Sequence, residues 1–135
     1  DKNRRKYRVI ITPPFTLLDN FAKYFKNRKI GIGAQNCFYK DYFSSDTGAI
    51  SAYMIKSLGS KYVIIGHSEN RIAGETDEDI NKKIHSALNK NLKVIFCIGE
   101  TSKEKRKKIT FSVLKRQINR GFHCIFNRLT INLNV

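Results

Sequence analysis

The chain has 135 residues, of which 41% are hydrophobic and 27% are charged, a composition typical of one folded domain and unlike that of a disordered chain. No apolar run approaches the roughly 18 residues that a membrane-spanning helix requires. The basic opening segment, DKNRRKYR, is not followed by the apolar stretch of a secretory signal. The chain opens on Asp1, and both cleavage of a transit peptide and truncation are compatible with that start.

The charge is strongly positive, because 26 Lys and Arg residues stand against 11 Asp and Glu residues, a formal net charge of +15. Such a balance points toward a nucleic-acid partner. The basic residues, however, gather in segments typical of helix surfaces and connections, without interleaved aromatic residues or a nucleic-acid-binding motif. We therefore interpret the charge as a solvated surface that also attracts small anionic substrates, and keep a nucleic-acid-binding module as a less favoured alternative.

The cysteines do not suggest a disulfide framework. There are three of them, Cys37, Cys97 and Cys124, an odd number without a short pairing between them. This favours a reducing compartment. Cys97 lies within VIFCIG, where we expect a small buried thiol.

Four short apolar runs, rich in Val and Ile, predict strands that are buried on both faces. In chain order they span residues 7–12, 30–34, 62–66 and 93–99.

Amphipathic stretches separate these runs. The first spans residues 16–27, with Leu17, Phe21 and Phe25 at a spacing of four, which predicts that these three side chains share one buried face. The most basic stretch, residues 103–119, is predicted to be a single helix.

Two further helices have recognisable ends. A helix over residues 49–59 is predicted to end at Gly59. A helix over residues 77–91 begins with acidic residues, which the helix dipole favours in the first turn. Its predicted buried stripe consists of Ile80, Ile84 and Leu88.

The alternation of strand and helix, repeated at intervals of roughly 30 residues, is typical of βαβ units and predicts parallel strands. The fold class is therefore α/β, either a doubly wound sheet or part of a (β/α) barrel. The connection over residues 36–48 is long for its place and is expected to be functional. The segment over residues 121–135 alternates in part and could form an edge strand, although no partner strand can be assigned.

Polar side chains follow the strands at their carboxyl ends, where ligands bind in parallel α/β folds. The clearest case is GHSENR, in which His67 comes directly after a glycine and is followed by Ser68 and Glu69. His67 is the candidate catalytic residue, and a hydrogen-bonded structural histidine is the alternative. We expect no metal site, because no His or Cys pair has ligand-like spacing, and no serine triad, because no G-x-S-x-G motif is present.

Several motifs in the same order resemble those of the triosephosphate isomerase family. They are PPF, GAQN, TGAIS, GHSE, GETDE and KVIFCIGET. The resemblance runs from about residue 8 to residue 119 and implies a partial (β/α)8 TIM barrel containing the second to fifth strands of eight. It divides the chain into a partial barrel domain, residues 1–119, and an atypical tail, residues 120–135, which does not match the family.

The resemblance also implies an activity. The family interconverts dihydroxyacetone phosphate and glyceraldehyde 3-phosphate through an enediol, in glycolysis and gluconeogenesis, without a cofactor or metal. His67 matches the neutral histidine that polarises the substrate carbonyl, for which this family is the standard example. Ser68, Glu69 and Cys97 are expected around it. Glu69 matches a glutamate of the family that lies in the same pocket.

The family is homodimeric, and three residues match its interface. Gln35 and Asn36 match a pair at a strand end that faces the partner subunit, and Thr47 matches the threonine that reaches the partner's active site.

Two parts of the family's machinery have no match in this sequence. They are the substrate-binding lysine of an N-x-K motif after the family's first strand and the glutamate base of a later YEPVWAIGTG-like stretch. Asn70 also stands where the family usually has arginine. We expect a fragment that is inactive or nearly so alone and poorly stable, because half a barrel leaves two strand edges unpaired. A non-catalytic scaffold derived from the isomerase is the alternative, and the expected location is the cytoplasm or, alternatively, an organelle that imports the protein.

Overall fold

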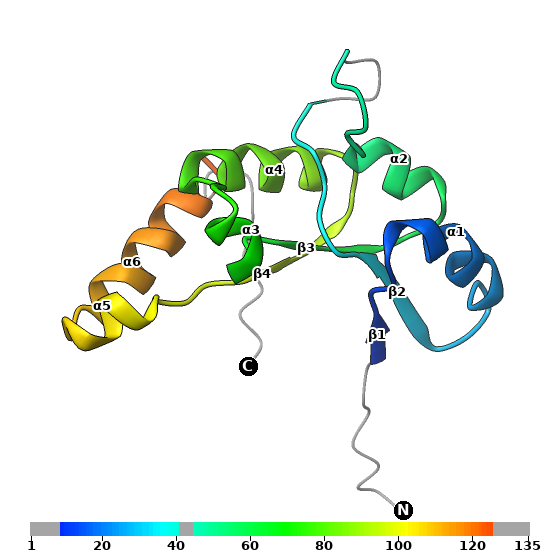
Figure 1. Cartoon of the computed structure of the whole chain (residues 1–135). Coiled ribbons are helices and arrows are strands. Elements are labelled where there is room, and N and C mark those ends of the chain that lie inside the picture. Colours follow the sequence, from blue (N-terminus) through cyan, green and yellow to red (C-terminus); the bar gives the residue numbers. More distant parts are fainter. Residues whose placement is uncertain (1–8, 41–44, 126–135) are drawn as a thin grey trace, which may run out of the picture.

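The computed structural model describes residues 9–40 and 45–125 and alternates strands with helices along the chain (Figure 1). The elements are β1 (Val9–Ile11), α1 (Phe15–Tyr24), β2 (Ile30–Ala34), α2 (Ala52–Ser57), β3 (Tyr62–Ile65), α3 (Ser68–Ile72), α4 (Asp77–Asn89), β4 (Lys93–Phe96), α5 (Ser102–Arg106) and α6 (Thr110–Gly121). Among these residues, no helix is both long and apolar enough to cross a membrane.

The strands form a four-stranded sheet in the order β1-β2-β3-β4, and every neighbouring pair is parallel. Four parallel strands are therefore confirmed within the described residues; β2 has the predicted bounds, and the other three are shorter than their apolar runs. The expected burial on both faces is wrong for β1 and β4, whose residues are exposed or half-buried because these are the outer strands of the described sheet. Parallel order without a skipped strand brings all four carboxyl ends to one edge. The loops that carry the polar motifs begin at this edge.

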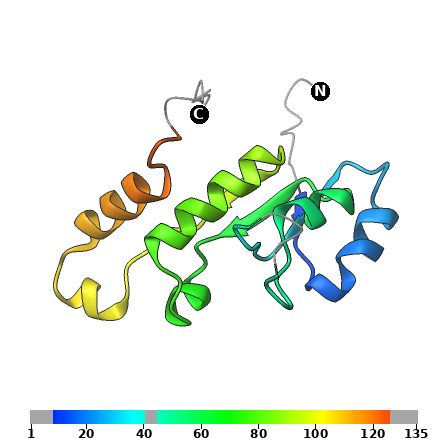
Figure 2. The ribbon, with the colours of Figure 1, turned by 90° about the horizontal axis from the view of Figure 1, so that it is seen from above.

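One face of the sheet carries the core. Val63 and Ile65 of β3 are fully buried, as are Ile80 and Ile84 of α4. Leu88 also packs against this core, so the predicted stripe of α4 is confirmed. Figures 1 and 2 show α1, α2 and α4 side by side over this face of the sheet.

The alternate positions of the strands point to the other face. On this face Tyr62 of β3 lies across two glycines of β2, because a Cβ atom at Gly31 would stand 2.6 Å from Cε2 of Tyr62 and one at Gly33 would stand 2.9 Å from its Cβ. The two missing side chains on β2 thus make room for one aromatic ring.

Helix α1 buries a different stripe from the one predicted. Leu17 is 43% exposed, whereas its neighbour Leu18 is buried. Phe21 and Phe25 do pack against the core. The prediction was wrong for Leu17 because a spacing of four also fits the adjacent stripe through Leu18 and Ala22, which is the stripe that meets the sheet.

The predicted last helix is two helices, α5 and α6. Lys108 has a left-handed φ of 57° and stands just after the end of α5. The amide of Ile109 donates to the carbonyl of Glu104, and that of Lys108 donates to the carbonyl of Lys105, which together form a Schellman motif. The run of lysines contains no glycine, and glycine is the usual sequence signal for such an ending.

The predicted end of α2 is confirmed. Gly59 follows the helix with a φ of 87°, and its amide donates to the carbonyl of Lys56. The helix begins later than predicted, at Ala52, because the side chain of Ser51 accepts a hydrogen bond from the amide of Met54 and caps it.

The start of the predicted tail is not a strand. Helix α6 continues to Gly121, and a turn then brings Ile125 into the core. The Asn81 side chain of α4 donates to the carbonyls of Gly121 and His123, which fastens this turn to α4. Residues 126–135, the rest of the predicted edge strand, lie outside the described residues.

Candidate active site

The site lies at the carboxyl ends of β3 and β4, in a hollow of about 790 Å³. It is built from the loop after β3, the loop after β4 and the short helices α3 and α5. Helix α3 was not predicted from the sequence. The residues that line it are Gly66, His67, Ser68, Arg71, Ile72, Cys97, Ile98, Gly99, Glu100, Thr101, Ser102, Lys103 and Arg106.

His67 stands at the start of α3 and caps it. Its Nδ1 accepts a hydrogen bond of 3.4 Å from the backbone amide of Glu69. An Nδ1 that accepts carries no proton, so the neutral ring with its proton on Nε2 is the form that suits this contact. The side chain is 46% exposed and lines the hollow.

Glu69 and Ser68 flank this histidine. The Glu69 carboxylate lies 3.6 Å from Nδ1 of His67, beyond hydrogen-bond length, and its side chain is 86% exposed. Solvent therefore screens this pair, and the backbone contact is the one that orients the ring. Ser68 lines the hollow and is exposed.

Arg71 of α3 ties the two strand ends together. Its Nε donates to the carbonyl of Gly66 at 2.8 Å, and its Nη2 donates to the carbonyl of Cys97 at 3.3 Å. Its Nη1 donates to Oδ1 of Asp77 at 2.8 Å. One guanidinium thus holds the end of β3, the end of β4 and the start of α4.

Gly66 has little room for a side chain. Its φ is 78°, in the left-handed region. A Cβ atom there would stand 3.0 Å from the carbonyl oxygen of Cys97 and 3.1 Å from Nη2 of Arg71. The glycine before the histidine is therefore needed both for its conformation and for the close approach of the arginine.

The β4 side of the hollow is held by Gln117 of α6. Its side-chain oxygen accepts from the amide of Gly99 at 2.8 Å, and its side-chain nitrogen donates to the carbonyl of Gly99 at 2.9 Å. Cys97 lies next to this loop and lines the hollow, half-buried. The prediction of a buried thiol at Cys97 was wrong, because it continues β4, the outer strand of the described sheet, whose apolar residues are likewise only half-buried.

Two of the predicted interface residues, Gln35 and Asn36, directly follow β2, and the third, Thr47, lies in the long connection after them. The Gln35 side chain donates to the carbonyl of Thr12 at 3.0 Å. Asn36 accepts from the amide of Cys37 at 2.8 Å and from Nζ of Lys83 at 3.1 Å. Thr47 is exposed in the long connection. These three residues lie away from the hollow of His67, and none of them lines it.

A buried ion pair lies behind Asn36. Lys83 of α4 donates to Oε1 of Glu75, and both side chains are nearly inaccessible to solvent. Oε2 of Glu75 is buried and has no hydrogen-bond partner among the described residues. Burial raises the pKa of the neighbouring Cys37 thiol to about 12, against an opposing effect of the Lys83 charge.

Sequence reasoning did not find Arg71, Gln117 or Lys83. Each is an ordinary polar residue at a helical position, and each has at least one partner far along the chain, which is Cys97 for Arg71, Gly99 for Gln117 and Asn36 for Lys83. Only the arginine had a sequence signal, since it stands four residues after the candidate histidine and one turn of helix brings it back to the strand end.

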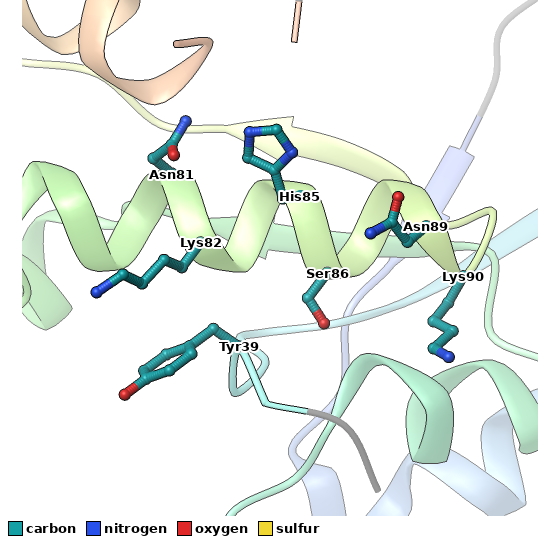
Figure 3. A pocket seen from close by; sticks show the side chains of 7 residues that line it. All are labelled: Tyr39, Asn81, Lys82, His85, Ser86, Asn89 and Lys90. Carbon is teal, nitrogen blue, oxygen red and sulfur yellow. The ribbon is translucent and has the colours of Figure 1, made fainter. Parts of the chain in front are cut away.

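A second hollow, of about 390 Å³, lies along the exposed face of α4 (Figure 3). Its lining is polar, with Lys82, Ser86 and Lys90 along α4 and Tyr39 across from them. His85, whose Nε2 lies 3.1 Å from the carbonyl of His123, already serves to hold the turn after α6. Neither hollow contains three side chains of the metal-ligating kinds close together, and no such group occurs elsewhere in residues 9–40 and 45–125.

The sequence model of the triosephosphate isomerase family matches residues 1–133. The chain belongs to this family. It is 43% identical over 121 residues to the triosephosphate isomerase of Geotalea uraniireducens and 47% identical over 111 residues to that of Alkaliphilus metalliredigens. These alignments cover 89% and 82% of the chain but 48% and 44% of the two relatives, so the chain spans about half their length.

The fold agrees with the family. The crystal structure of triosephosphate isomerase from Bartonella henselae is similar, with a TM-score of 0.80 and 37% sequence identity. The similarity covers 83% of this chain and 47% of that one. The predicted partial (β/α)8 barrel is therefore confirmed as the fold of the described residues.

Proposed function

We propose that this chain carries part of a triose-phosphate isomerase site, with His67 as the residue that polarises the substrate carbonyl. The observation that carries the proposal is the position of His67, whose Nδ1 accepts from the start of α3 while the ring borders the hollow at the strand ends. The substrates are the family's triose phosphates, and the basic charge of the chain favours such anions.

The chemistry follows from the protonation state of the ring. A base removes the proton from the carbon beside the carbonyl, and the electron pair moves onto the carbonyl oxygen as the carbon–carbon double bond forms. Nε2–H of His67 donates to that oxygen and stabilises its developing charge. The proton of the second oxygen passes to the first oxygen, and the neutral ring of His67 can carry it between the two. As the second oxygen becomes the carbonyl, the base returns its proton to the neighbouring carbon, which gives the isomer.

The base is not among the motifs of these 135 residues. We infer that the family's glutamate base and substrate lysine come from outside them, because the chain spans about half the length of its relatives. The isolated chain is then inactive or nearly so. The whole protein is proposed to act in the cytoplasm as a homodimer, with Gln35, Asn36 and Thr47 toward the partner subunit.

The test compares the 135-residue chain with the intact protein from its source, after the mass of the latter is measured. Isomerisation of glyceraldehyde 3-phosphate is followed by a coupled assay for dihydroxyacetone phosphate. We expect activity in the intact protein, a loss of about 100-fold or more in His67→Gln, and none in the isolated chain. His85→Gln, on the exposed face of α4, is the matched control. An intact protein that is active and keeps full activity in His67→Gln would contradict the assignment.

A further inference from the structure

We propose that Arg71 is a positioning residue for His67, an inference that rests on the proposed function of the histidine. Its role is to hold the peptide group between Gly66 and His67, and thereby the direction in which the imidazole points. The arginine itself does not contact the reacting atoms.

The first argument is the atom that Arg71 holds. The carbonyl of Gly66 belongs to the peptide bond that leads into His67, and the Nε of Arg71 donates to it at 2.8 Å. A rotation of this peptide group would turn the Cα–Cβ bond of His67 and would move Nδ1 away from the amide of Glu69, a contact that is already long at 3.4 Å. The arginine therefore acts on the same geometry that selects the tautomer of the ring.

The second argument is that Arg71 cannot easily move. Its side chain is 17% exposed, and that of its partner Asp77 is 13% exposed. The other oxygen of Asp77 accepts from Nε of Arg116 at 3.1 Å. Both carboxylate oxygens are thus engaged, and the guanidinium is held from the side opposite the strand ends.

The third argument is the shape of the guanidinium. Three donors in one plane reach the carbonyl of Gly66, the carbonyl of Cys97 and the carboxylate of Asp77 at the same time. An ammonium group is a compact point charge and cannot reproduce this fork. The space for the fork exists because residue 66 has no Cβ atom, which would approach Nη2 to 3.1 Å.

The experiment uses the ring nitrogens of His67 as its readout, which does not require isomerase activity. Nitrogen-15 NMR of the histidine rings reports which nitrogen carries the proton and how the ring titrates, and His67→Gln assigns the signals. The variants are Arg71→Met and Arg71→Lys. Arg116→Met is the matched control, because it removes a charge from Asp77 and leaves all contacts of Arg71 in place.

We expect the folded Arg71→Met protein to lose the preference for the proton on Nε2 and to exchange the amides of Gly66 and His67 at least about tenfold faster. Arg71→Lys should recover little of either property, and Arg116→Met should keep both. In the intact, active protein, kcat should fall by about 100-fold with a small change in KM. Wild-type ring signals and amide exchange in folded Arg71→Met, or in Arg71→Lys where the former does not fold, would overturn the proposal. The NMR readout does not depend on isomerase activity. A failure of the positioning role of Arg71 can therefore be distinguished from a failure of the proposed function of His67.

Discussion

Two ion pairs of similar burial lie behind the strand ends, and they differ in how completely their acceptors are used. In the first pair, the side chains of Arg71 and Asp77 are 17% and 13% exposed, and each oxygen of Asp77 accepts a hydrogen bond, one from Arg71 and one from Arg116. In the second pair, the side chains of Lys83 and Glu75 are 11% and 7% exposed, and one oxygen of Glu75 has no partner among the described residues.

The difference matters because the desolvation of a buried charge is offset only when its remaining acceptors are also satisfied. The pair of Arg71 and Asp77 meets that condition and lies beside His67. The pair of Lys83 and Glu75 does not, and it lies beside Asn36, one of the residues proposed to face a partner subunit. The first region is therefore expected to tolerate the loss of an outer contact, and the second to depend on Lys83, the cation that contacts Glu75.

The largest expected effect is that of Lys83→Met, which leaves the Glu75 carboxylate buried and uncompensated. We expect the free energy of unfolding to fall by about 3–5 kcal/mol, measured by urea denaturation. Lys82→Met, at the exposed neighbouring position, should leave the midpoint nearly unchanged. A loss below about 1 kcal/mol in Lys83→Met would mean that the two pairs do not differ as their contacts suggest.

Cys37 gives a local measure of the same change. Burial raises its pKa to about 12, so its thiol should not react with iodoacetamide at neutral pH, whereas the exposed Cys124 should react readily. Loss of the Lys83 charge can only raise this pKa further. We therefore expect any alkylation of Cys37 that becomes measurable in Lys83→Met, under conditions where most of the protein is folded, to come from local opening of the site. Equal alkylation rates for Cys37 in the wild-type protein and in Lys83→Met would show that the substitution does not disturb this part of the core.

The next largest effect is that of Gly66→Ala, beside the other ion pair. The added Cβ atom meets the carbonyl of Cys97 and the guanidinium of Arg71, and φ is left-handed. We expect a loss of about 2–4 kcal/mol in unfolding free energy. Gly59→Ala is the matched control, since its φ of 87° is equally left-handed but nothing stands within 4 Å of the added atom. Its cost should be about 1–2 kcal/mol, and equal losses in the two variants would exclude a steric role for Arg71.

A smaller effect is expected from Gln117→Leu, which removes both hydrogen bonds to Gly99 while keeping an apolar side chain of similar size at a buried position. The unfolding free energy should fall by only about 1–2 kcal/mol, because Gly99 is exposed and water can replace the hydrogen bonds that its backbone loses. Lys115→Gln on the same helix serves as the control. Faster amide exchange at Gly99 should accompany the loss of stability. Unchanged exchange there would argue against a role for Gln117 in holding this loop.

The smallest effect is the pH dependence of the α4 cap, which supports the helix that carries Lys83. Hydrogen bonds from the side chain and then the backbone of Thr76 lower the pKa of Asp79. A lowered carboxyl pKa stabilises the fold above the unfolded value of about 3.9 and loses this contribution as pH falls through the folded value. Asp79→Asn should therefore flatten the decline of the melting temperature between pH 5 and pH 2, roughly the window of such titrations, and an unchanged slope would contradict this. Asp19→Asn, on an exposed pair of α1, is the control.

The presence of parallel strands and the location of the site could be predicted from the sequence because both depend on local patterns, whereas the order of the strands in the sheet was implied only by the family resemblance. Continuous Val- and Ile-rich runs predict buried parallel strands, and the glycine before His67 marks a strand end. The stripe of Ile80, Ile84 and Leu88 was also predictable, since it is long and periodic. For α1 the pattern fitted two adjacent stripes, and only the packing against the sheet selected Leu18 over Leu17.

The remaining features depend on contacts between distant residues. The break between α5 and α6 occurs at a lysine, which has no intrinsic preference for a left-handed φ. Cys97 is half-buried, like the apolar residues of β4 before it, because β4 is the outer strand of the described sheet, a position that periodicity does not define. The contacts of Gln117 with Gly99 and of Lys83 with Asn36 join segments that the sequence does not place together, so no motif could have identified them. For Arg71, the spacing of four from His67 predicts its return to the strand end but not its contact with Cys97.

The ring of Tyr62 across Gly31 and Gly33 couples the residues that these three positions can hold. A Cβ atom at Gly31 would come within 2.6 Å of the ring and one at Gly33 within 2.9 Å of the Tyr62 Cβ, so a side chain at Gly31 requires the ring to shift or to be absent. Alanine at position 31 is therefore expected to be better tolerated together with a smaller residue at position 62, and Phe there does not suffice because it keeps the ring.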